Sequence, residues 1–374
     1  MRIAYVCADP GIPLCGAKGA SLHLRSLAAA LARRGHELLV VCARTDGPNP
    51  APPGARVVEL PSEPQVRWLI GEFDSAGIET VLERYSLPSG AALVAARALG
   101  LPFTLEVNAP LADEAARFRG LQDVDMWRER ERKLLADADR VVVVSTALLD
   151  HALDAGARPG AVSVVPNGVQ LELFRRGGRE AMRHQLGIDA ATIVIGFAGS
   201  LKPWHGVGLL LEAFAGLPSS YRLLVLGEGP ERKPLAAQAR RLGLGARAIF
   251  TGAVLHAEIP AHLDAMDIGA APFEPMAGFY FSPLKVVEYL AAGLPVVASG
   301  QGDLPLLVGD AGILYEPGSQ DELTGALRRL GEDSALRSRL GRNAATRAAT
   351  LDWDSVAARV ENVLAAELHQ GMRA

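Results

Sequence analysis

The sequence predicts an α/β protein with two doubly wound domains, each built on a parallel sheet. Three observations lead to this prediction. Short apolar, β-prone runs recur along the 374 residues without apolar–polar alternation, which is typical of parallel strands buried on both faces. Segments rich in Ala and Leu separate these runs, as helices do in α/β folds. The pattern breaks at Gly, Pro and Arg residues between 166 and 187 and then begins again.

The first half opens with a strand, a loop and a helix. Residues 3–7 are a short apolar run, and the loop over 9–19 is rich in Gly and Pro. Ser21 is a suitable N-cap for the next helix, whose leucines recur on one face. Gly35 supplies a left-handed stop before a second strand over 38–42.

The remaining elements repeat this alternation. In the first half we expect strands at 57–60, 80–82, 103–107 and 140–144, and helices at 90–99, 117–137 and 146–155. In the second half we expect strands at 193–198, 223–226, 248–251, 268–271, 295–298 and 313–314, and an almost entirely helical segment over 320–368. Two facing domains of this kind would place the carboxyl ends of both sheets at one cleft, where ligands bind.

Composition and charge exclude several classes of protein. The sequence has 38 Lys and Arg against 42 Asp and Glu, a net charge of −4, so it lacks the basic field of a general nucleic-acid binder. Its three cysteines, Cys7, Cys15 and Cys42, have no metal-ligand spacing, and their odd number favours a reducing compartment. The first apolar run is too short for a signal peptide, and no 18-residue apolar segment occurs. We therefore expect a cytoplasmic protein without a transmembrane segment or a nucleic-acid partner.

No metal site is expected. The Asp-x-Asp sequences at 123–125 and 352–354 each precede a charged helix, so we interpret them as carboxylates that stabilise helix starts. The histidines include no His-Glu-x-x-His, and no Gly-x-Ser-x-Gly sequence indicates a hydrolase nucleophile.

The segment over 279–298 carries the strongest functional signal. Ser282 is predicted as the N-cap of a helix and Pro283 as its first residue. Lys285 would then be the third helical residue, where a cation is unfavourable unless an anion binds the free N–H groups. The pattern favours a phosphate site, and a lysine that carries its charge into water is the alternative.

Two further features fit a phosphate-bearing ligand. Glu288 follows Lys285 by one helical turn and could accept both hydroxyls of a ribose, although a surface Lys–Glu pair is equally compatible with the spacing. The glycine-rich turn over 196–206 joins a predicted strand to a helix. Its glycines would let a ligand approach the backbone, and Lys202 and His205 would supply positive charge.

In the first half, two places border the carboxyl edge of the predicted sheet. Gly16, Lys18 and Gly19 lie between the first strand and its helix, without the spacing of a dinucleotide-binding or P-loop sequence. Glu106 and Asn108 lie at the end of a predicted strand that opens onto the expected cleft. Polar residues are also common where loops begin, so this signal is modest.

Together these motifs resemble the family 4 retaining glycosyltransferases, which have the GT-B fold. The matching segments are Val165-Pro-Asn-Gly-Val169, Gly199-Ser-Leu…Gly206, Gly227-Glu-Gly-Pro230 and Ser282-Pro-Leu-Lys…Val297-Ala298. The resemblance extends over nearly the whole chain. It implies an acceptor-binding domain of residues 1–170 and a nucleotide-sugar-binding domain of residues 171–351. The last helix, over about 352–374, would cross back to the first domain.

The resemblance also implies roles for single residues. Glu288 would hold the ribose diol, Val254 would border the base, and Lys285 with the backbone around Leu284 would bind the diphosphate. Gly16 and Gly19 would form a loop that closes over phosphate and acceptor. The other candidate substrate-binding residues are Lys18, Gly199, Ser200, His205, Tyr280, Phe281, Ser282 and Pro283. The candidate catalytic residues are Glu106, Asn108, Lys202 and Lys285.

The sequence departs from the family pattern in three places. Tyr280 occupies the position of the first Glu in the E-x7-E motif, near the expected sugar ring. Ser200 and His205 replace the usual Arg and Lys, which leaves Lys202 as the cation of that turn. The catalytic His that the family usually has after the fourth strand is missing.

The resemblance implies transfer of a sugar, with retention, from a nucleoside-diphosphate sugar to an acceptor, without metal or cofactor. The main electrostatic task would be to stabilise the leaving diphosphate. Two alternatives stay open: a sugar-nucleotide epimerase of the same fold, and a non-catalytic nucleotide-sugar binder in which Tyr280 marks lost activity. The sequence does not specify base, sugar or acceptor, which could be a saccharide, a natural product or lipid-linked. The helix over 117–137, with Trp127, could rest on a membrane surface where a lipid-linked acceptor lies, although such a helix is more often simply amphipathic and solvated.

Overall fold

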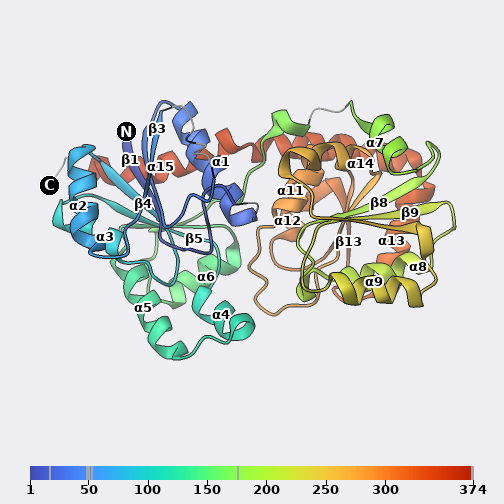
Figure 1. The fold of residues 1–374 in the computed structure, drawn as a ribbon, viewed down its shortest axis with the longest axis horizontal. Coiled ribbons are helices and arrows are strands. Elements are labelled where there is room, and N and C mark those ends of the chain that lie inside the picture. Colours follow the sequence, from blue (N-terminus) through green and yellow to red (C-terminus); the bar gives the residue numbers. More distant parts are fainter. Residues whose placement is uncertain (17, 48–50, 52–53, 175–176, 372–374) are drawn as a thin grey trace. The chain divides into compact units, whose positions relative to one another are not determined.

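The chain forms two α/β units (Figure 1). The computed structural model describes residues 1–16, 18–47, 51, 54–174 and 177–371. The first unit comprises Met1–Gly168, Tyr280–Ser282 and Trp353–Ala374, and the second comprises Val169–Phe279 and Pro283–Asp352. Tyr280–Ser282 thus belong to the first unit, although the residues on both sides belong to the second.

The first unit contains a parallel sheet with the strand order β3-β2-β1-β4-β5-β6-β7. Its strands are β1 (Arg2–Cys7), β2 (Glu37–Cys42), β3 (Ala55–Glu59), β4 (Thr80–Arg84), β5 (Phe103–Val107), β6 (Arg140–Val143) and β7 (Val162–Val164). Strands β4 and β5 are buried at every residue, which explains why they show no alternation. The strand order reverses between β1 and β4, and ligands bind open α/β sheets at the carboxyl edge of such a point.

The helices of this unit are α1 (Gly19–Arg33), α2 (Gln65–Ser75), α3 (Ala91–Ala98), α4 (Leu111–Arg119), α5 (Val124–Asp137), α6 (Thr146–Asp154) and α15 (Trp353–Gly371). As the resemblance implies, the C-terminal helix α15 returns to the first unit, where it packs against α1 (Figure 1). Arg33 donates to Asp354 at 2.6 Å and Arg34 donates to Glu361 at 2.6 Å.

The second unit contains a parallel sheet with the order β10-β9-β8-β11-β12-β13. Its strands are β8 (Ile193–Ala198), β9 (Tyr221–Leu226), β10 (Ala248–Gly252), β11 (Ile268–Ala271), β12 (Val296–Ser299) and β13 (Gly312–Tyr315). Its α-helices are α7 (Arg179–Gln185), α8 (Val207–Ala215), α9 (Arg232–Arg241), α10 (Ile259–Asp264), α11 (Leu284–Ala291), α12 (Leu304–Val308), α13 (Gln320–Glu332) and α14 (Ser334–Ala348). Two doubly wound parallel sheets confirm the predicted fold class.

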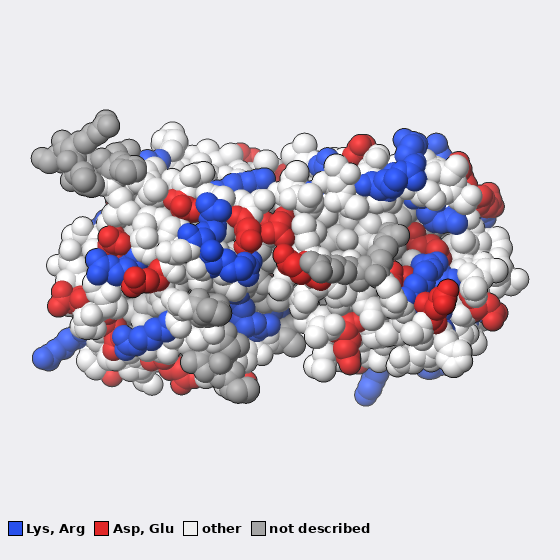
Figure 2. All heavy atoms as spheres, turned by 90° about the horizontal axis from the view of Figure 1, so that it is seen from above, with Lys and Arg blue, Asp and Glu red and all other residues white. Residues whose placement is uncertain are grey.

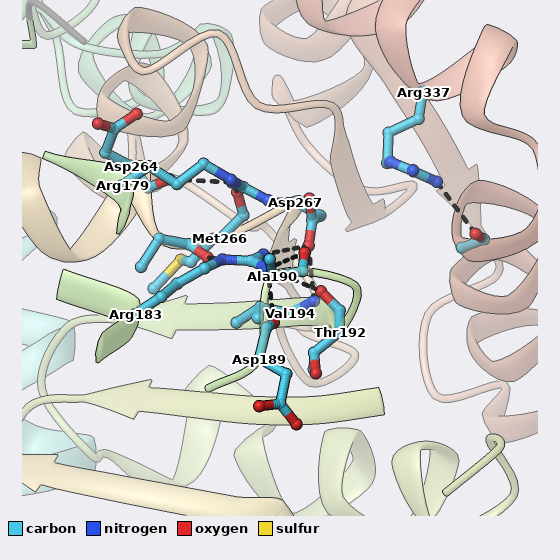
Figure 3. Close-up of polar contacts among 12 residues, drawn as sticks. Arg179, Arg183, Asp189, Ala190, Thr192, Val194, Asp264, Met266, Asp267 and Arg337 are labelled. Atoms are coloured by element: carbon cyan, nitrogen blue, oxygen red, sulfur yellow. Dashed lines mark hydrogen bonds and ion pairs between the residues drawn. The ribbon is translucent and has the colours of Figure 1, made fainter. Parts of the chain in front are cut away.

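A buried arginine anchors the start of the second unit to its sheet (Figure 3). Arg183 of α7 is 3% exposed. Its Nη1 donates to the carbonyl groups of Asp189, Ala190 and Thr192, and its Nη2 donates to the carboxylate of Asp267 at 2.7 Å. Because each of these acceptors is already bound to Arg183, the arrangement is structural.

Charged side chains of both signs are interspersed on the face shown in Figure 2. On the described part of this face, Lys and Arg alternate with Asp and Glu over short distances. This mixture matches the net charge of −4.

Several local predictions are wrong. The helix expected over 117–137 is divided into α4 and α5, because Gly120 ends α4 in the left-handed conformation with a φ of 66°. Ser21 lies buried inside α1, and Lys18 is the N-cap residue instead. Helix α2 and strand β7 were not predicted. Gly35 does adopt the predicted left-handed conformation, with a φ of 87°.

Candidate functional site

Lys285 is buried within the second unit, so the alternative of a solvated surface lysine is wrong. Its side chain is 8% exposed, and its Nζ has no hydrogen-bond partner among the described residues. Nζ lies 4.1 Å from the ring centre of Phe197 and 4.9 Å from that of Phe273. Burial lowers the pKa of Lys285 to about 7, although Glu288 acts in the opposite direction. A buried ammonium with unused donors is costly unless an anion binds it.

Two glycines bring the turns after β8 and β9 close to this lysine. A Cβ atom at Gly199 would lie 3.0 Å from Cε and 3.1 Å from Nζ of Lys285. A Cβ atom at Gly227 would lie 1.9 Å from the carbonyl oxygen of Gly199. Both glycines have positive φ values, 139° and 135°, which side-chain-bearing residues rarely adopt. Lys285 therefore lies directly against the backbone of the glycine-rich turn.

His205 of this turn is neutral, which corrects the prediction that it supplies positive charge. Its Nδ1 contacts the carbonyl oxygen of Ser200, and its ring packs edge-on against Phe273 with centres 5.4 Å apart. Burial, followed by the charge of Lys285, lowers the pKa of His205 to about 3. Lys202 lies beside the turn, with Nζ 5.8 Å from the ring centre of Trp204.

Helix α11 begins at Leu284, and Pro283 is its N-cap residue. Lys285 is consequently the second helical residue and not the third. The predicted cap fails because Ser282 is engaged elsewhere: its hydroxyl accepts from the backbone N–H of Asn167 at 3.0 Å, and its carbonyl accepts from the Asn167 side-chain amide at 2.6 Å. Among the described residues no side chain caps α11, so the N–H groups of Leu284 and Lys285 remain available to an anion, whereas that of Val286 donates to the Pro283 carbonyl at 3.0 Å.

Glu288 has a partner that the sequence did not reveal. Its Oε1 lies 3.2 Å from Nε2 of His256, and its side chain is 13% exposed. His256 follows β10 in the same loop as Val254, which is half-buried. The structure thus brings the loop after β10 beside α11. No sequence pattern connects these residues, which are 32 positions apart.

In the first unit, Glu106 is buried and both of its carboxylate oxygens have neighbours. Oε2 accepts from the Tyr5 hydroxyl at 2.7 Å, and Oε1 contacts Nε2 of His23. Burial alone would raise the pKa of Glu106, but His23 and Arg84 hold it well below its usual range. A 2% exposed carboxylate whose pKa is lowered and whose two oxygens are both engaged is a poor general base. This geometry argues against the predicted catalytic role of Glu106 and indicates a positioning role.

His23 connects Glu106 to Asn167, near the end of the segment Met1–Gly168 of the first unit. Its Nδ1 donates to Oδ1 of Asn167 at 2.6 Å. Oδ1 is the acceptor because the amide nitrogen of Asn167 donates to the Ser282 carbonyl. The imidazole also packs edge-on against Trp353, with ring centres 5.1 Å apart. Nothing in the sequence marks His23, which lies near the start of a predicted helix.

Tyr280 is directed into the first unit. Its hydroxyl donates to Oε2 of Glu114 on α4 at 2.7 Å, and its carbonyl accepts from the Ser145 hydroxyl at 2.8 Å. Its ring centre lies 4.4 Å from that of Phe281. Burial and the Glu114 charge raise the pKa of Tyr280. Its predicted place near the sugar stays a prediction.

The loop before α1 is held by its own backbone. The Gly16 N–H donates to the carbonyl of Pro13 at 2.9 Å, and a Cβ at Gly16 would lie 2.6 Å from the Ser21 hydroxyl. The exposed Lys18 donates to the Gly11 carbonyl at 3.1 Å, and Gly19 begins α1. Asn108, just after β5, is half-buried.

Three other findings limit where the site can be. Within the described residues, no three His, Cys, Asp or Glu side chains gather as a metal site. No described helix has the length and apolar character to cross a bilayer. A groove of about 1010 Å³ lies beside Asp267 and Pro295, which precede β11 and β12 and so mark the amino edge of the second sheet. Lys285 and Gly199 lie at the opposite, carboxyl edge.

Comparison with known families identifies the chain. The family described as Glycosyltransferase Family 4 matches residues 17–173, and the family described as Glycosyl transferases group 1 matches residues 192–333. These two matches cover most of the first half and most of the second. The chain belongs to glycosyltransferase family 4.

Curated relatives of this family 4 protein include two D-inositol 3-phosphate glycosyltransferases. The one from Corynebacterium glutamicum (strain R) is 32% identical over 252 residues, which are 62% of this chain and 58% of that protein. The one from Mycobacterium tuberculosis (strain H37Ra) is 33% identical over 261 residues, which are 66% of this chain and 52% of that protein. The chain therefore matches little more than half the length of each.

Solved structures share the fold over nearly the whole chain. Sucrose-phosphate synthase from Thermosynechococcus elongatus has a TM-score of 0.79 at 21% identity, covering 99% of this chain and all of that one. HepE from Anabaena, in complex with UDP, has a TM-score of 0.80 at 23% identity, covering 98% of this chain and all of that one. These likenesses confirm the GT-B fold of this family 4 protein.

Proposed function

We propose that this chain transfers a sugar, with retention of configuration and without a metal ion, from a nucleoside-diphosphate sugar to an acceptor hydroxyl. The observation that carries the proposal is the buried, unpartnered ammonium of Lys285 at the uncapped N-terminus of α11. Both groups attract anions, and the leaving diphosphate is where negative charge develops during the transfer.

The nucleotide would lie along the carboxyl edge of the second sheet. Its phosphates would bind Lys285 and the N–H groups around Leu284, beside the turn at Gly199. The carboxylate of Glu288, oriented by His256, would accept the two ribose hydroxyls. Solved structures of Anabaena HepE contain UDP or UDP-glucose, which makes a uridine nucleotide the first donor to test.

The reaction requires little from a protein base. The bond from the sugar to the diphosphate breaks, and a bond from the sugar to the acceptor oxygen forms on the same face. The acceptor's proton passes to the departing diphosphate. This path agrees with the engaged state of Glu106, which leaves that carboxylate without a proton-accepting role. Lys285 would contribute by stabilising the charge of the leaving group.

Isothermal titration with UDP tests the donor site. Replacing Lys285 by Met removes the charge and keeps the length, so we expect affinity to fall about tenfold to hundredfold, the usual value of a charged hydrogen bond. The matched control is Lys233→Met, an exposed lysine of α9 in the same unit. Equal UDP affinity in the wild type and Lys285→Met would contradict the proposal.

Turnover with UDP-glucose tests the reaction. D-Inositol 3-phosphate is the first acceptor to supply, because the curated relatives are named for it. Nuclear magnetic resonance of the products would show an axial glycosidic bond if configuration is retained. An altered sugar nucleotide formed without acceptor would instead indicate an epimerase, and binding without turnover on any acceptor would indicate a non-catalytic binder.

A further inference from the structure

The guanidinium of Arg84, the last residue of β4, is buried and makes no hydrogen bond among the described residues. It is 7% exposed, and its Nη1 is fully enclosed and unpartnered. Its one ion pair is with Oε1 of Glu106 at 3.8 Å, which is too long for a hydrogen bond. A guanidinium offers five N–H donors in a planar fork. Burying such a group unsatisfied is costly.

Glu106 is not available to satisfy Arg84. Its oxygens already contact the hydroxyl of Tyr5 and the imidazole of His23. Turning the carboxylate toward Arg84 would break contacts that are themselves buried. Nη1 of Arg84 therefore has no partner among the described residues once this network is complete.

A second unsatisfied donor lies at the same edge of the sheet. Asn108 follows Glu106 by two residues, and its Nδ2 atom is buried without a hydrogen bond to any described residue. Arg84 is paired in the sheet with Cys7 on one side and Glu106 on the other. It thus lies at the carboxyl end of β4 beside β1, where the strand order reverses, the place at which ligands bind doubly wound sheets.

We propose that Arg84, together with Asn108, binds an anionic group, a phosphate or a carboxylate, carried by the acceptor. The guanidinium fork matches two oxygens of such a group, and the Asn108 amide donates to an oxygen of the same group. The inference rests on the proposed function for its assignment to the acceptor. It adds a requirement that sugar transfer does not impose, because transfer needs only a hydroxyl on the acceptor.

Binding of inorganic phosphate tests the site without any turnover. The titration uses Lys285→Met, so that the donor-site lysine does not contribute, and compares it with the double variant Lys285→Met/Arg84→Gln. We expect Arg84→Gln to weaken phosphate binding at least about tenfold, the value of a charged hydrogen bond. Arg84→Lys, which keeps the charge and loses the planar fork, should recover part of the lost phosphate affinity. Arg97→Gln, at an exposed arginine paired with Asp139, should leave it unchanged.

A purely structural Arg84 gives a different result. In that case Arg84→Gln lowers the thermal midpoint of the free protein, and phosphate raises that midpoint equally in both variants. Superimposable phosphate isotherms for Lys285→Met and the double variant would overturn the proposal. So would the absence of phosphate and acetate binding by Lys285→Met.

Steady-state kinetics separate this site from the donor site. Arg84→Gln should raise KM for an anionic acceptor at least about tenfold and leave KM for the sugar nucleotide and for neutral acceptors unchanged. If UDP binding and turnover are absent altogether, the proposed function fails, while the phosphate titration still reports on Arg84.

Discussion

The two units place charged groups at the carboxyl edges of similar sheets, with opposite outcomes. In the first unit, the carboxylate of Glu106 is joined by Tyr5 and His23 into a network. In the second, the ammonium of Lys285 lies between aromatic rings without a hydrogen bond. Removing one partner of a satisfied buried charge destabilises the fold, whereas a buried charge that is never satisfied costs stability and marks a place for a ligand. The difference separates Glu106, a positioning residue, from Lys285, a binding residue.

The largest effect on stability is expected at the satisfied site. Glu106→Gln removes the charge that offsets buried Arg84 and weakens the bonds from Tyr5 and His23. The free energy of unfolding should fall by about 3–5 kcal/mol, as when one partner of a buried pair is removed. Urea denaturation measures it. Glu129→Gln, in an exposed pair with Arg132, should change it by less than about 1 kcal/mol. Equal effects would mean that the buried network at Glu106 contributes no more to stability than an exposed ion pair.

At Lys285 the change in the free energy of unfolding should have the opposite sign. Lys285→Met replaces a buried, unpaired ammonium by an apolar group of similar length. Without ligand, the free energy of unfolding should rise by about 1–4 kcal/mol, as when buried charges are replaced by apolar groups. Lys233→Met serves as the control in the same urea series. A fall in stability would mean that the free protein already satisfies Lys285.

The stability of the wild type should depend on pH because of this lysine. Burial lowers the pKa of Lys285 to about 7 in the folded protein, from 10.5. Between these two values the unfolded chain binds more protons, so the free energy of unfolding rises with pH, by up to about 1.4 kcal/mol per pH unit. Urea denaturation at pH 7.5 and 8.5 should show this gain in the wild type and not in Lys285→Met. Parallel curves for the two proteins would contradict it.

A further comparison concerns two tyrosines bound to carboxylates in the first unit. Tyr280 donates to Glu114 at 2.7 Å, and Tyr85 donates to Glu131 at 3.1 Å. Replacing either by Phe should lower the free energy of unfolding by about 1–2 kcal/mol. If Tyr280 also lies near the sugar, only Tyr280→Phe should raise KM for the sugar nucleotide. Identical kinetics in the two variants would leave Tyr280 a structural role.

The strands could be predicted because burial on both faces leaves a local signature. Those at 103–107, 193–198 and 268–271 were predicted to the residue. The site was only partly predictable, because its contacts join distant segments. Lys285 and Glu288 share one helix and could be connected by spacing, whereas the partner of Glu288, His256, comes from another loop.

The wrong predictions at Ser282 and His205 share a physical cause: contacts and burial in the folded chain override what the local sequence favours. Ser282 has the sequence of a helix cap, but Asn167 binds both its hydroxyl and its carbonyl. His205 was expected to be cationic, and burial makes it neutral. Arg84 was missed because its predicted strand ended at residue 82. Two charged residues directly after a buried run were the available signal there.

The path of the chain has a consequence for exchanging parts between relatives. It passes from one unit to the other four times, after residues 168, 279, 282 and 352. A fragment ending at residue 168 would lack α15, whose Val356, Val360 and Leu364 are at most 2% exposed. Their partners on α1 would then face water, which favours aggregation. A chimaera of two homologues joined at a single crossover near residue 168 therefore carries mismatched α1 and α15, so recombination should succeed only when the C-terminal helix travels with the first half.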